Sequence, residues 1–390
     1  MTDTTNECPI RMQDLPAATD RATAWDMVRR HGPVFRSGDD WFVTSAEACR
    51  FVTRNPDLFS SATHGDTLNA PTPYIPGGID PPAHLGYRQV IDRMFAPKVL
   101  GAMEGGLRAR LNELIDGFAG SGRCEVMTDI AQIFPVEVFM QIFGLPLEDR
   151  AMLAEWVHTT LVGAYDDGGV ARAVSARENL EQYLSELFAE RRAQPRADFV
   201  SYILAQGWSD AEVMGTAFNV VQGGLDTMTG AIGLIFYHLA SDPELQRKVR
   251  ADPELIDVVV EEILRIDPPV PFSNRTATRD VEVEGVLIPA GAHVFVAYGA
   301  ASSDPQAFEC PASVDLHQQN RRDIYTFGGG THRCLGSHLA RRELHLVLEE
   351  FHRRIPFYEL EPGYQHKVRW PSVVMSPDRV PLVFAAGEGE

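Results

Sequence analysis

Cysteine is scarce in this chain of 390 residues, and its few copies are scattered. There are five, an odd number with no C-x-x-C pair: Cys8, Cys49, Cys124, Cys310 and Cys334. This pattern excludes a disulfide scaffold and the ligand spacing of a zinc finger, and it is typical of a reducing compartment. We therefore expect a cytoplasmic protein.

The chain also lacks an excess of basic residues and a long apolar segment. Its 35 Lys and Arg stand against 54 Asp and Glu, and the net charge of -19 argues against a nucleic-acid partner. The first residues show no basic region followed by an apolar one, so no signal peptide is predicted. The run IGLIFYHLA is far shorter than the ~20 residues that cross a bilayer. No membrane association is expected.

Hydrophobic residues make up 44% of the chain, which is enough to bury a large core. Because no internal repeat or flexible linker interrupts the sequence, residues 1–390 are expected to form a single domain. Helical periodicity dominates from about residue 100 to 265, and shorter β-prone runs lie on both sides of it. The pattern predicts a mainly α fold with a smaller β part.

Several β-prone stretches are marked by turn residues. Residues 32–45 predict a strand pair that turns at Gly38, and residues 281–296 predict a β-meander. Short strands are also expected over 373–384. Residues 61–83 are rich in Pro, Gly and Thr and predict a long loop of the kind that often carries function.

Helix boundaries are marked by capping residues. Ser209 and Glu212 form a capping box before a periodic segment that runs to about residue 239. Asp242 and Asp252 each precede Pro and Glu, the arrangement of an N-cap followed by a helix. A last long helix is predicted over 335–354.

The decapeptide FGGGTHRCLG places Cys334 in a glycine-rich turn where a helix begins. A cysteine at a helix N-terminus has its thiolate favoured by the helix dipole and by free backbone N–H groups. The glycines at 328, 329, 330 and 336 leave room for a bulky flat group to approach the backbone. These features indicate an axial metal ligand, although a buried, inert cysteine is the alternative.

The same stretch matches F-x-x-G-x-x-x-C-x-G at Phe327, Gly330, Cys334 and Gly336, with His332 two residues before the cysteine. It resembles the haem-binding loop of the cytochrome P450 family, and in particular its soluble bacterial members. The resemblance implies that the thiolate of Cys334 binds the iron of haem b and promotes O–O cleavage. It further implies a P450 fold, with haem between a long central helix and the helix that follows the cysteine loop.

Glu262 and Arg265 lie three residues apart in EEILRI, so they share a helix face and can pair. Such a pair is most often solvent-exposed. This pair stands where the family keeps its E-x-x-R motif, and the resemblance implies a structural ion pair that supports the haem loop.

The predicted central helix contains Gly223 and Gly224 in its middle, each of which costs about 1 kcal/mol relative to alanine. A tight helix crossing would explain them, and so would an opening of the helix over a flat cofactor. Asp226 and Thr227 follow, and GGLDT resembles the oxygen-activating segment of the family. The resemblance implies that Thr227 holds a hydrogen-bonded network at the oxygen site and that Asp226 relays protons.

Two haem propionates inside a protein need basic donors. The candidates match family positions that hold propionates: His84, Arg88, Arg275 and His332.

The stretches YIPGGIDPP, GGLDT and HLARRE resemble the camphor-hydroxylating branch of the family. By that register Thr72 replaces a substrate-binding tyrosine, with Tyr74 two residues on, and this difference argues against camphor itself. Asn219 and Gln222 precede Gly223 on the central helix and are candidate polar contacts to substrate. A hydrogen bond from Asn219 to a neighbouring helix is the alternative for that residue.

Phe272 is a candidate apolar wall of the same pocket. A mostly apolar pocket with a few polar anchors suits a terpenoid or norisoprenoid that carries one oxygen.

No flavin or nicotinamide domain is visible, so a separate donor, a ferredoxin with its reductase, is expected. Because ferredoxins are acidic, a local basic patch should dock it, and its candidates are Arg88, Arg93, Lys98, Arg341 and Arg342. For Arg341 and Arg342 an ordinary solvated helix face is the alternative. The protein is expected to be a monomer.

The sequence thus predicts a haem-dependent monooxygenase that inserts one oxygen atom of O2 into a small hydrophobic substrate. A peroxide-driven relative is the alternative among enzymes, and a haem-based gas sensor or carrier is the alternative outside them. Asp226 and Thr227 argue against the first, and the second lacks a visible signalling segment.

Overall fold

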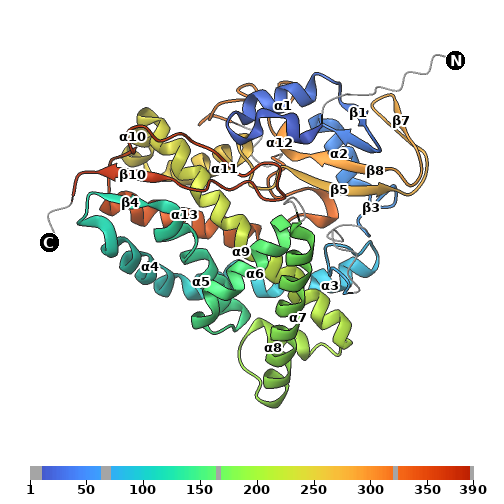
Figure 1. Cartoon of the computed structure of the whole chain (residues 1–390), viewed down its shortest axis with the longest axis horizontal. Helices are drawn as coiled ribbons and strands as arrows, with labels where there is room; N and C mark the ends of the chain where they lie inside the picture. The colour runs from blue at the N-terminus through green and yellow to red at the C-terminus, as the bar shows by residue number, and fades with distance from the viewer. Residues whose placement is uncertain (1–10, 63–71, 164–167, 319–323, 387–390) are drawn as a thin grey trace.

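A computed structural model describes residues 11–62, 72–163, 168–318 and 324–386. Cys8 and part of the predicted loop over 61–83 lie outside these residues. Figure 1 shows a large helical part and, at one end of the molecule, a sheet accompanied by α1, α2 and α12. The chain is therefore mainly α with a smaller β part, as predicted.

The helices, in chain order, are α1 (Arg21–Arg29), α2 (Ala46–Arg54), α3 (Ala83–Ile91), α4 (Pro97–Ala119), α5 (Phe134–Phe143), α6 (Arg150–Val162), α7 (Gly169–Ala193), α8 (Phe199–Leu204), α9 (Asp210–Ser241), α10 (Pro243–Ala251), α11 (Ile256–Ile266), α12 (Tyr298–Ala301) and α13 (Ser337–Arg354). The strands are β1 (Val34–Ser37), β2 (Asp40–Val43), β3 (Phe59–Ser60), β4 (Arg123–Glu125), β5 (Phe272–Ala277), β6 (Val281–Val283), β7 (Val286–Ile288), β8 (His293–Ala297), β9 (Tyr358–Leu360) and β10 (Pro381–Phe384).

Helix α9 is the long central helix that the capping box predicts. The Glu212 N–H donates to Ser209 Oγ at 3.3 Å, and the Ser209 N–H donates to the Glu212 carboxylate at 2.7 Å. Most of the helix is buried, and it packs against α5, α6, α7 and α11. Residues in its middle therefore lie at the centre of the helical part.

The strands form one main sheet and two small ones. The main sheet has the order β1-β2-β8-β5-β3, in which β2 and β8 run parallel and the other neighbours antiparallel. Gly38, at φ +60, makes the predicted turn between β1 and β2.

The predicted meander over 281–296 is wrong in its third strand. β6 and β7 pair with each other, but β8 joins the main sheet instead. The reason lies in the turn before β8, where the Gly291 N–H donates to the Ala277 carbonyl at 2.8 Å. This bond brings the chain back to the end of β5, and β8 then runs along β5.

Helix boundaries follow the capping signals closely. The Asp242 carboxylate accepts from two N–H groups at the start of α10, and Asp252 accepts from the Glu254 N–H at 3.1 Å. Asp252 opens a single 3-10 turn, and α11 continues from Ile256. The predicted last helix is α13, which begins two residues later than expected, at Ser337.

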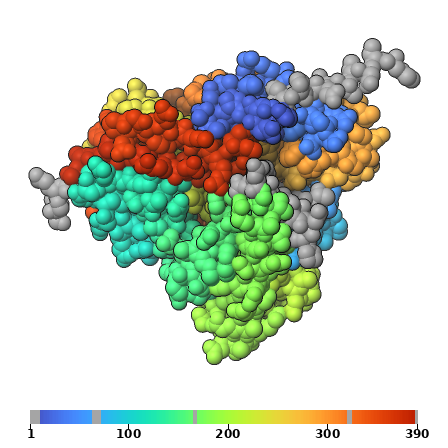
Figure 2. All heavy atoms as spheres, in the orientation of Figure 1, coloured from blue at the N-terminus to red at the C-terminus, as the bar shows by residue number. Residues whose placement is uncertain are grey.

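The residues after α13 cross from one part of the molecule to the other. In Figure 2 the red C-terminal atoms form a band between the blue N-terminal helices and the teal region of α4. The Val368 N–H donates to the Ala18 carbonyl at 2.8 Å, and the Met375 N–H donates to the Pro269 carbonyl at 2.7 Å. This segment fastens the sheet part to the end of α11 and brings residues near 370 close to α9.

Candidate active site

The cysteine loop is shaped by backbone bonds and by glycines with positive φ. The Cys334 N–H donates to the Phe327 carbonyl at 2.8 Å, and a 3-10 turn covers Gly330–His332. Gly328 and Gly330 have φ of +66 and +62, a conformation that favours glycine. The Cys334 side chain at the end of this loop is accessible, in contrast to buried Cys49 and Cys124.

The electrostatics of Cys334 differ from the expectation of a lowered pKa. Desolvation by the surrounding protein raises the pKa of this thiol, even though the side chain remains accessible. The Gly336 N–H and the charges of Arg88, Arg341 and Arg333 act in the opposite direction. The loop therefore supplies groups that stabilise a thiolate, but packing around the sulfur outweighs them in the free thiol.

Glu262 and Arg265 form a fully buried, bidentate ion pair at 3.0 and 2.9 Å, with both side chains 0% exposed. The solvent-exposed alternative is therefore wrong. Arg265 also donates to the carbonyls of Ser302, Cys310, Pro311 and Ser313 at 2.8 to 3.0 Å. The pair thus fastens α11 to the segment that leads towards the cysteine loop.

The two adjacent glycines of α9 have different surroundings. A Cβ on Gly224 would lie 2.5 Å from the Phe139 ring on α5, so this glycine permits a tight helix crossing. A Cβ on Gly223 would meet nothing within 4 Å. The Thr227 hydroxyl donates to the Gly223 carbonyl at 3.0 Å, so Thr227 shares this open face of the helix. The tight crossing therefore explains Gly224, whereas α9 is an unbroken helix through Gly223 and the expected opening of the helix is not seen.

Asp226 lies next to Thr227 in sequence, but its side chain contacts α6. Asp226 Oδ2 lies 2.9 Å from His158 Nδ1, and His158 Nε2 lies 2.8 Å from Arg369 Nη1. Sequence reasoning missed both partners, because His158 and Arg369 stand in no motif and are 211 residues apart.

Two of the four propionate candidates meet directly. The ring centroids of His84, on α3, and His332, in the cysteine loop, are 4.3 Å apart. His84 is 1% exposed, and neither of its ring nitrogens has a hydrogen-bond partner among the described residues. Burial, followed by the charge of Arg88, lowers the pKa of His84. A buried imidazole without a partner beside the cysteine loop is suited to hold an acidic group.

The two arginine candidates are held by backbone carbonyls. Arg88 donates to the Arg333 carbonyl at 2.7 Å and pairs with Asp92 at 2.8 Å. Arg275, 4% exposed on β5, donates to the Asn274 carbonyl at 2.6 Å. A buried guanidinium whose assigned contacts are neutral atoms retains its charge for an anion. Together with His84, this donor set fits the carboxylates of haem.

Three of the substrate candidates connect the loop before α3 to neighbouring helices. Thr72 Oγ1 donates to Glu181 on α7 at 2.8 Å, and the Gly77 N–H donates to Asn219 Oδ1 at 3.0 Å. Burial raises the pKa of Tyr74 to about 12, and a hydrogen bond with the Asn219 side chain opposes this rise. Asn219 is therefore engaged with the loop.

The other two substrate candidates differ in their packing. Gln222 is 8% exposed, and no hydrogen bond of its amide is seen within the described part of the chain. Phe272 lies in an aromatic cluster with ring centroids 5.6 Å from Trp25 and 6.2 Å from Trp370. Gln222 is thus a polar group available to a ligand. The rings of Trp25 and Trp370 pack against Phe272 and restrict its movement.

The arginines of α13 expected to dock a donor are neutralised by acidic neighbours. Arg341 pairs with Glu261 of α11 and lies 4.3 Å from the centroid of the Phe327 ring. Arg342 pairs with Glu104 of α4. Both line a groove of about 430 Å³ between α4, α11 and α13. The surface there carries balanced charge.

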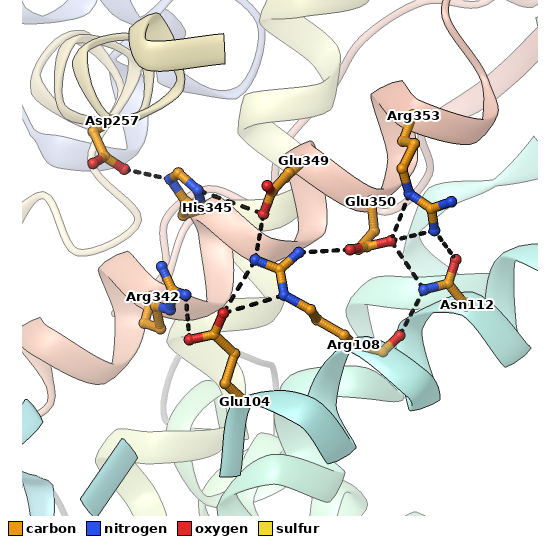
Figure 3. Close-up of polar contacts among 9 residues, drawn as sticks. All are labelled: Glu104, Arg108, Asn112, Asp257, Arg342, His345, Glu349, Glu350 and Arg353. Atoms are coloured by element: carbon orange, nitrogen blue, oxygen red, sulfur yellow. Dashed lines mark hydrogen bonds and ion pairs between the residues drawn. The ribbon is translucent and has the colours of Figure 1, made fainter. Parts of the chain in front are cut away.

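Figure 3 shows further pairs of opposite charge that link α4, α11 and α13. Arg108 lies between Glu349 and Glu350 at 2.7 and 2.6 Å, and His345 lies 2.7 Å from Asp257. The hydrogen bond from His345 lowers the pKa of Asp257. By contrast, Arg93 and Lys98 are exposed and have no ion pair among the described residues. The basic patch predicted from the sequence is therefore smaller than expected.

Two negative findings apply to the described residues alone. They contain no group of three or more His, Cys, Asp or Glu side chains that could hold a metal ion. None of their helices combines the length and the apolar character needed to cross a membrane.

The long buried helix, the glycine-rich cysteine loop and the buried E-x-x-R pair together are features of a haem-thiolate protein. A family model described as cytochrome P450 matches residues 164–367. Cytochrome P450 130 of Mycobacterium tuberculosis is 31% identical over 386 residues, 92% of this chain and 94% of that protein. The chain belongs to the cytochrome P450 family, a family of monooxygenases whose haem iron is ligated by a cysteine thiolate.

Other relatives agree with this membership. Probable cytochrome P450 127A1 of Sinorhizobium fredii is 33% identical over 83% of this chain and 78% of that protein. The crystal structure of myxobacterial cytochrome P450 CYP267B1, in complex with myristic acid, has a TM-score of 0.88 at 27% identity. It covers 96% of this chain and 99% of that one. These relatives belong to other bacterial P450 families, and the resemblance to the camphor branch is not supported.

Proposed function

We propose that Cys334 supplies the thiolate ligand and that the enzyme hydroxylates a small hydrophobic molecule of the terpenoid or norisoprenoid kind, as a cytoplasmic monomer. One observation carries the proposal. The loop that holds the accessible Cys334 also brings His332 against His84, a buried histidine whose ring nitrogens have no hydrogen-bond partner among the described residues. A thiolate-ligated haem supplies the oxygen chemistry, because the thiolate promotes O–O cleavage.

The donors around the loop would hold the haem carboxylates. His84 and His332 come from α3 and the cysteine loop, and Arg275 comes from β5, so the donors lie on separate elements. Because Arg275 is almost fully buried, a carboxylate bound to it would be shielded from water and held strongly. Arg88, one turn after His84 on α3, would also support the loop through its bond to the Arg333 carbonyl.

Thr227, on the open face of α9, and Asp226, which contacts α6, would deliver protons. The Thr227 hydroxyl donates its own proton to the Gly223 carbonyl, so its oxygen remains an acceptor for water. Asp226 is 20% exposed at its side chain and can exchange protons with solvent. An acid linked to a hydroxyl through water is the arrangement that general acid catalysis requires.

The side chain we assign to substrate is Gln222. The side chain is 8% exposed and its amide atoms are not among the fully buried ones without a partner, so a ligand oxygen could reach the amide. Asn219 is already bonded to the loop before α3, so it would shape the pocket through Tyr74 and Gly77. Related structures were solved with myristic acid and with testosterone, which are apolar molecules with few oxygens. Such molecules suit an apolar pocket with one polar anchor, bounded by Phe272.

Electrons would come from a ferredoxin and its reductase. Arg93 and Lys98, exposed near the start of α4, and Arg88 beside the cysteine loop would form the basic contact. Arg341 and Arg342 would contribute less, because Glu261 and Glu104 neutralise them. Association should then weaken with salt.

The deciding experiment is the difference spectrum of the reduced protein under carbon monoxide. The Soret band at the long-wavelength position of thiolate-bound haem is expected for the wild type and is expected to be lost in Cys334→Ser. Loss of the band in wild-type protein freshly reconstituted with haem would overturn the assignment. Terpenoids and fatty acids would then be screened by spin-state shifts, with Gln222→Leu as the comparison.

A further inference from the structure

Three distant segments meet at His158. The imidazole belongs to α6, and it lies between the carboxylate of Asp226 on α9 and the guanidinium of Arg369 in the segment between β9 and β10. The distances of 2.9 and 2.8 Å are those of good hydrogen bonds. Asp226 and Arg369 are the charged groups in contact with His158 within the described ranges.

The chemistry of the two partners determines the protonation of the ring. A guanidinium can only donate, so His158 Nε2 must accept from Arg369. The proton of the neutral ring therefore lies on Nδ1, and Nδ1–H donates to Asp226 Oδ2.

The position of Arg369 depends on close packing against α9. Gly230 and Gly233 lie about one and two turns after Asp226 on the same helix face. A Cβ on Gly230 would lie 2.8 Å from the Met375 carbonyl, and one on Gly233 would lie 3.2 Å from Pro377. The glycines therefore let the C-terminal segment lie directly on the helix, where Arg369 reaches His158.

We propose that His158 is a positioning residue for proton delivery, held with its proton on Nδ1 between Asp226 and Arg369. The hydrogen bond to Nδ1–H holds Oδ2 of Asp226, while Oδ1 has no partner in the described residues and faces solvent that reaches the side chain. Water can then connect Oδ1 to the Thr227 hydroxyl on the adjoining face. The role rests on the proposed function of Asp226 in proton delivery.

The geometry can be tested without turnover. In protein labelled with ¹⁵N histidine, the His158 signals, assigned by their loss in His158→Gln, should show a protonated Nδ1 and an unprotonated Nε2. In Arg369→Met, which keeps the packing of the side chain, the Nε2 signal should move because Nε2 loses its hydrogen-bond donor. A protonated Nε2 in the wild type would overturn the proposal.

The functional role is tested by a matched pair of variants. Asparagine places an amide N–H at the position of Nδ1, whereas glutamine places its amide at the position of Nε2. With NADH, a ferredoxin and its reductase, His158→Asn should consume dioxygen within about two-fold of the wild type. His158→Gln should be at least about three-fold slower, with a larger solvent isotope effect in D2O. Equal rates and isotope effects for the two variants would overturn the role.

Two further comparisons isolate the cause. In an Asp226→Asn background, His158→Gln should have no additional effect, because the residue acts through that carboxylate. Lys367→Gln, an exposed position two residues before Arg369, should behave like the wild type. If the carbon monoxide spectrum lacked the thiolate band, the proposed function would fail, whereas the ¹⁵N result would still decide the geometry of His158.

Discussion

A Cβ atom on Gly330 would lie 1.9 Å from the carbonyl oxygen of Thr53. The cysteine loop therefore rests directly on the C-terminal end of α2, and this contact leaves no space for a side chain. Gly330 also has a φ of +62, which an L-residue adopts at a cost. The glycine of the haem-loop motif thus serves two physical requirements at once.

We expect Gly330→Ala to destabilise the protein by at least about 2 kcal/mol, since it adds strain at positive φ to a backbone clash. Thermal unfolding would measure the loss, and the thiolate Soret band should weaken with it. Gly105→Ala is the control, because that glycine lies in α4 with nothing within 4 Å of its Cβ. It should be neutral or stabilising. Equal behaviour of the two variants would contradict the role of the contact.

Glu262→Gln should cost about 3–5 kcal/mol, because it leaves the buried Arg265 without its counter-charge. Urea unfolding monitored by circular dichroism would measure it. Lys248→Gln breaks an exposed pair with Glu244 and should change stability by less than about 0.5 kcal/mol. A mild effect of Glu262→Gln would mean that the carbonyls around Arg265 hold it without the carboxylate.

Stability should fall as the pH drops below about 6.5. Burial lowers the pKa of His352 to about 4, and burial together with the charge of Arg21 lowers the pKa of His366 to about 3. Both histidines then bind protons more readily in the unfolded chain, so their stabilisation is complete above pH 6.5 and declines below it. Between pH 7.5 and 5 the loss should be on the order of 2 kcal/mol for each.

Urea unfolding at the two pH values would measure this slope, and His352→Phe should reduce it. His338→Gln, at an exposed position of α13, should leave it unchanged. A free energy of unfolding that stays constant between pH 7.5 and 5 would show that neither histidine is buried in solution.

Asn219→Leu should release the loop before α3 from α9. The Gly77 amide, which donates to Asn219 Oδ1, should exchange with D2O about ten-fold faster, as expected for the loss of one hydrogen bond. Gln222→Leu removes an amide one turn further along α9 and should leave this exchange unchanged. If substrate binding also stayed the same in Asn219→Leu, Asn219 would have no part in the pocket.

Local signals in the sequence predicted much of the fold. The capping box of Ser209 and Glu212 begins α9, and Asp242 caps α10, because these bonds join residues that are neighbours in sequence. The glycine-rich loop was also predictable, since its motif is compact. The sequence could not separate the roles of Gly223 and Gly224, because the ring of Phe139 that distinguishes them belongs to α5.

Long-range pairing accounts for what the sequence could not predict. The partner of Asp226 lies 68 residues away in a helix with no motif. The sequence predicted a basic patch at Arg341 and Arg342. In the structure Glu261 and Glu104, which belong to other helices, neutralise these two arginines. A charge count along the chain does not reveal which charges will face one another after folding.

The parallel pairing of β2 with β8 joins Asp40–Val43 to His293–Ala297. During synthesis the free edge of β2 in the hairpin of β1 and β2 therefore has no partner strand until β8 has left the ribosome. Contacts this distant in sequence form slowly, and exposed edges are prone to pair with other chains. Since Cys334 follows β8, the sheet can close before the cysteine loop is made. Haem would then bind only after almost the whole chain has been synthesised.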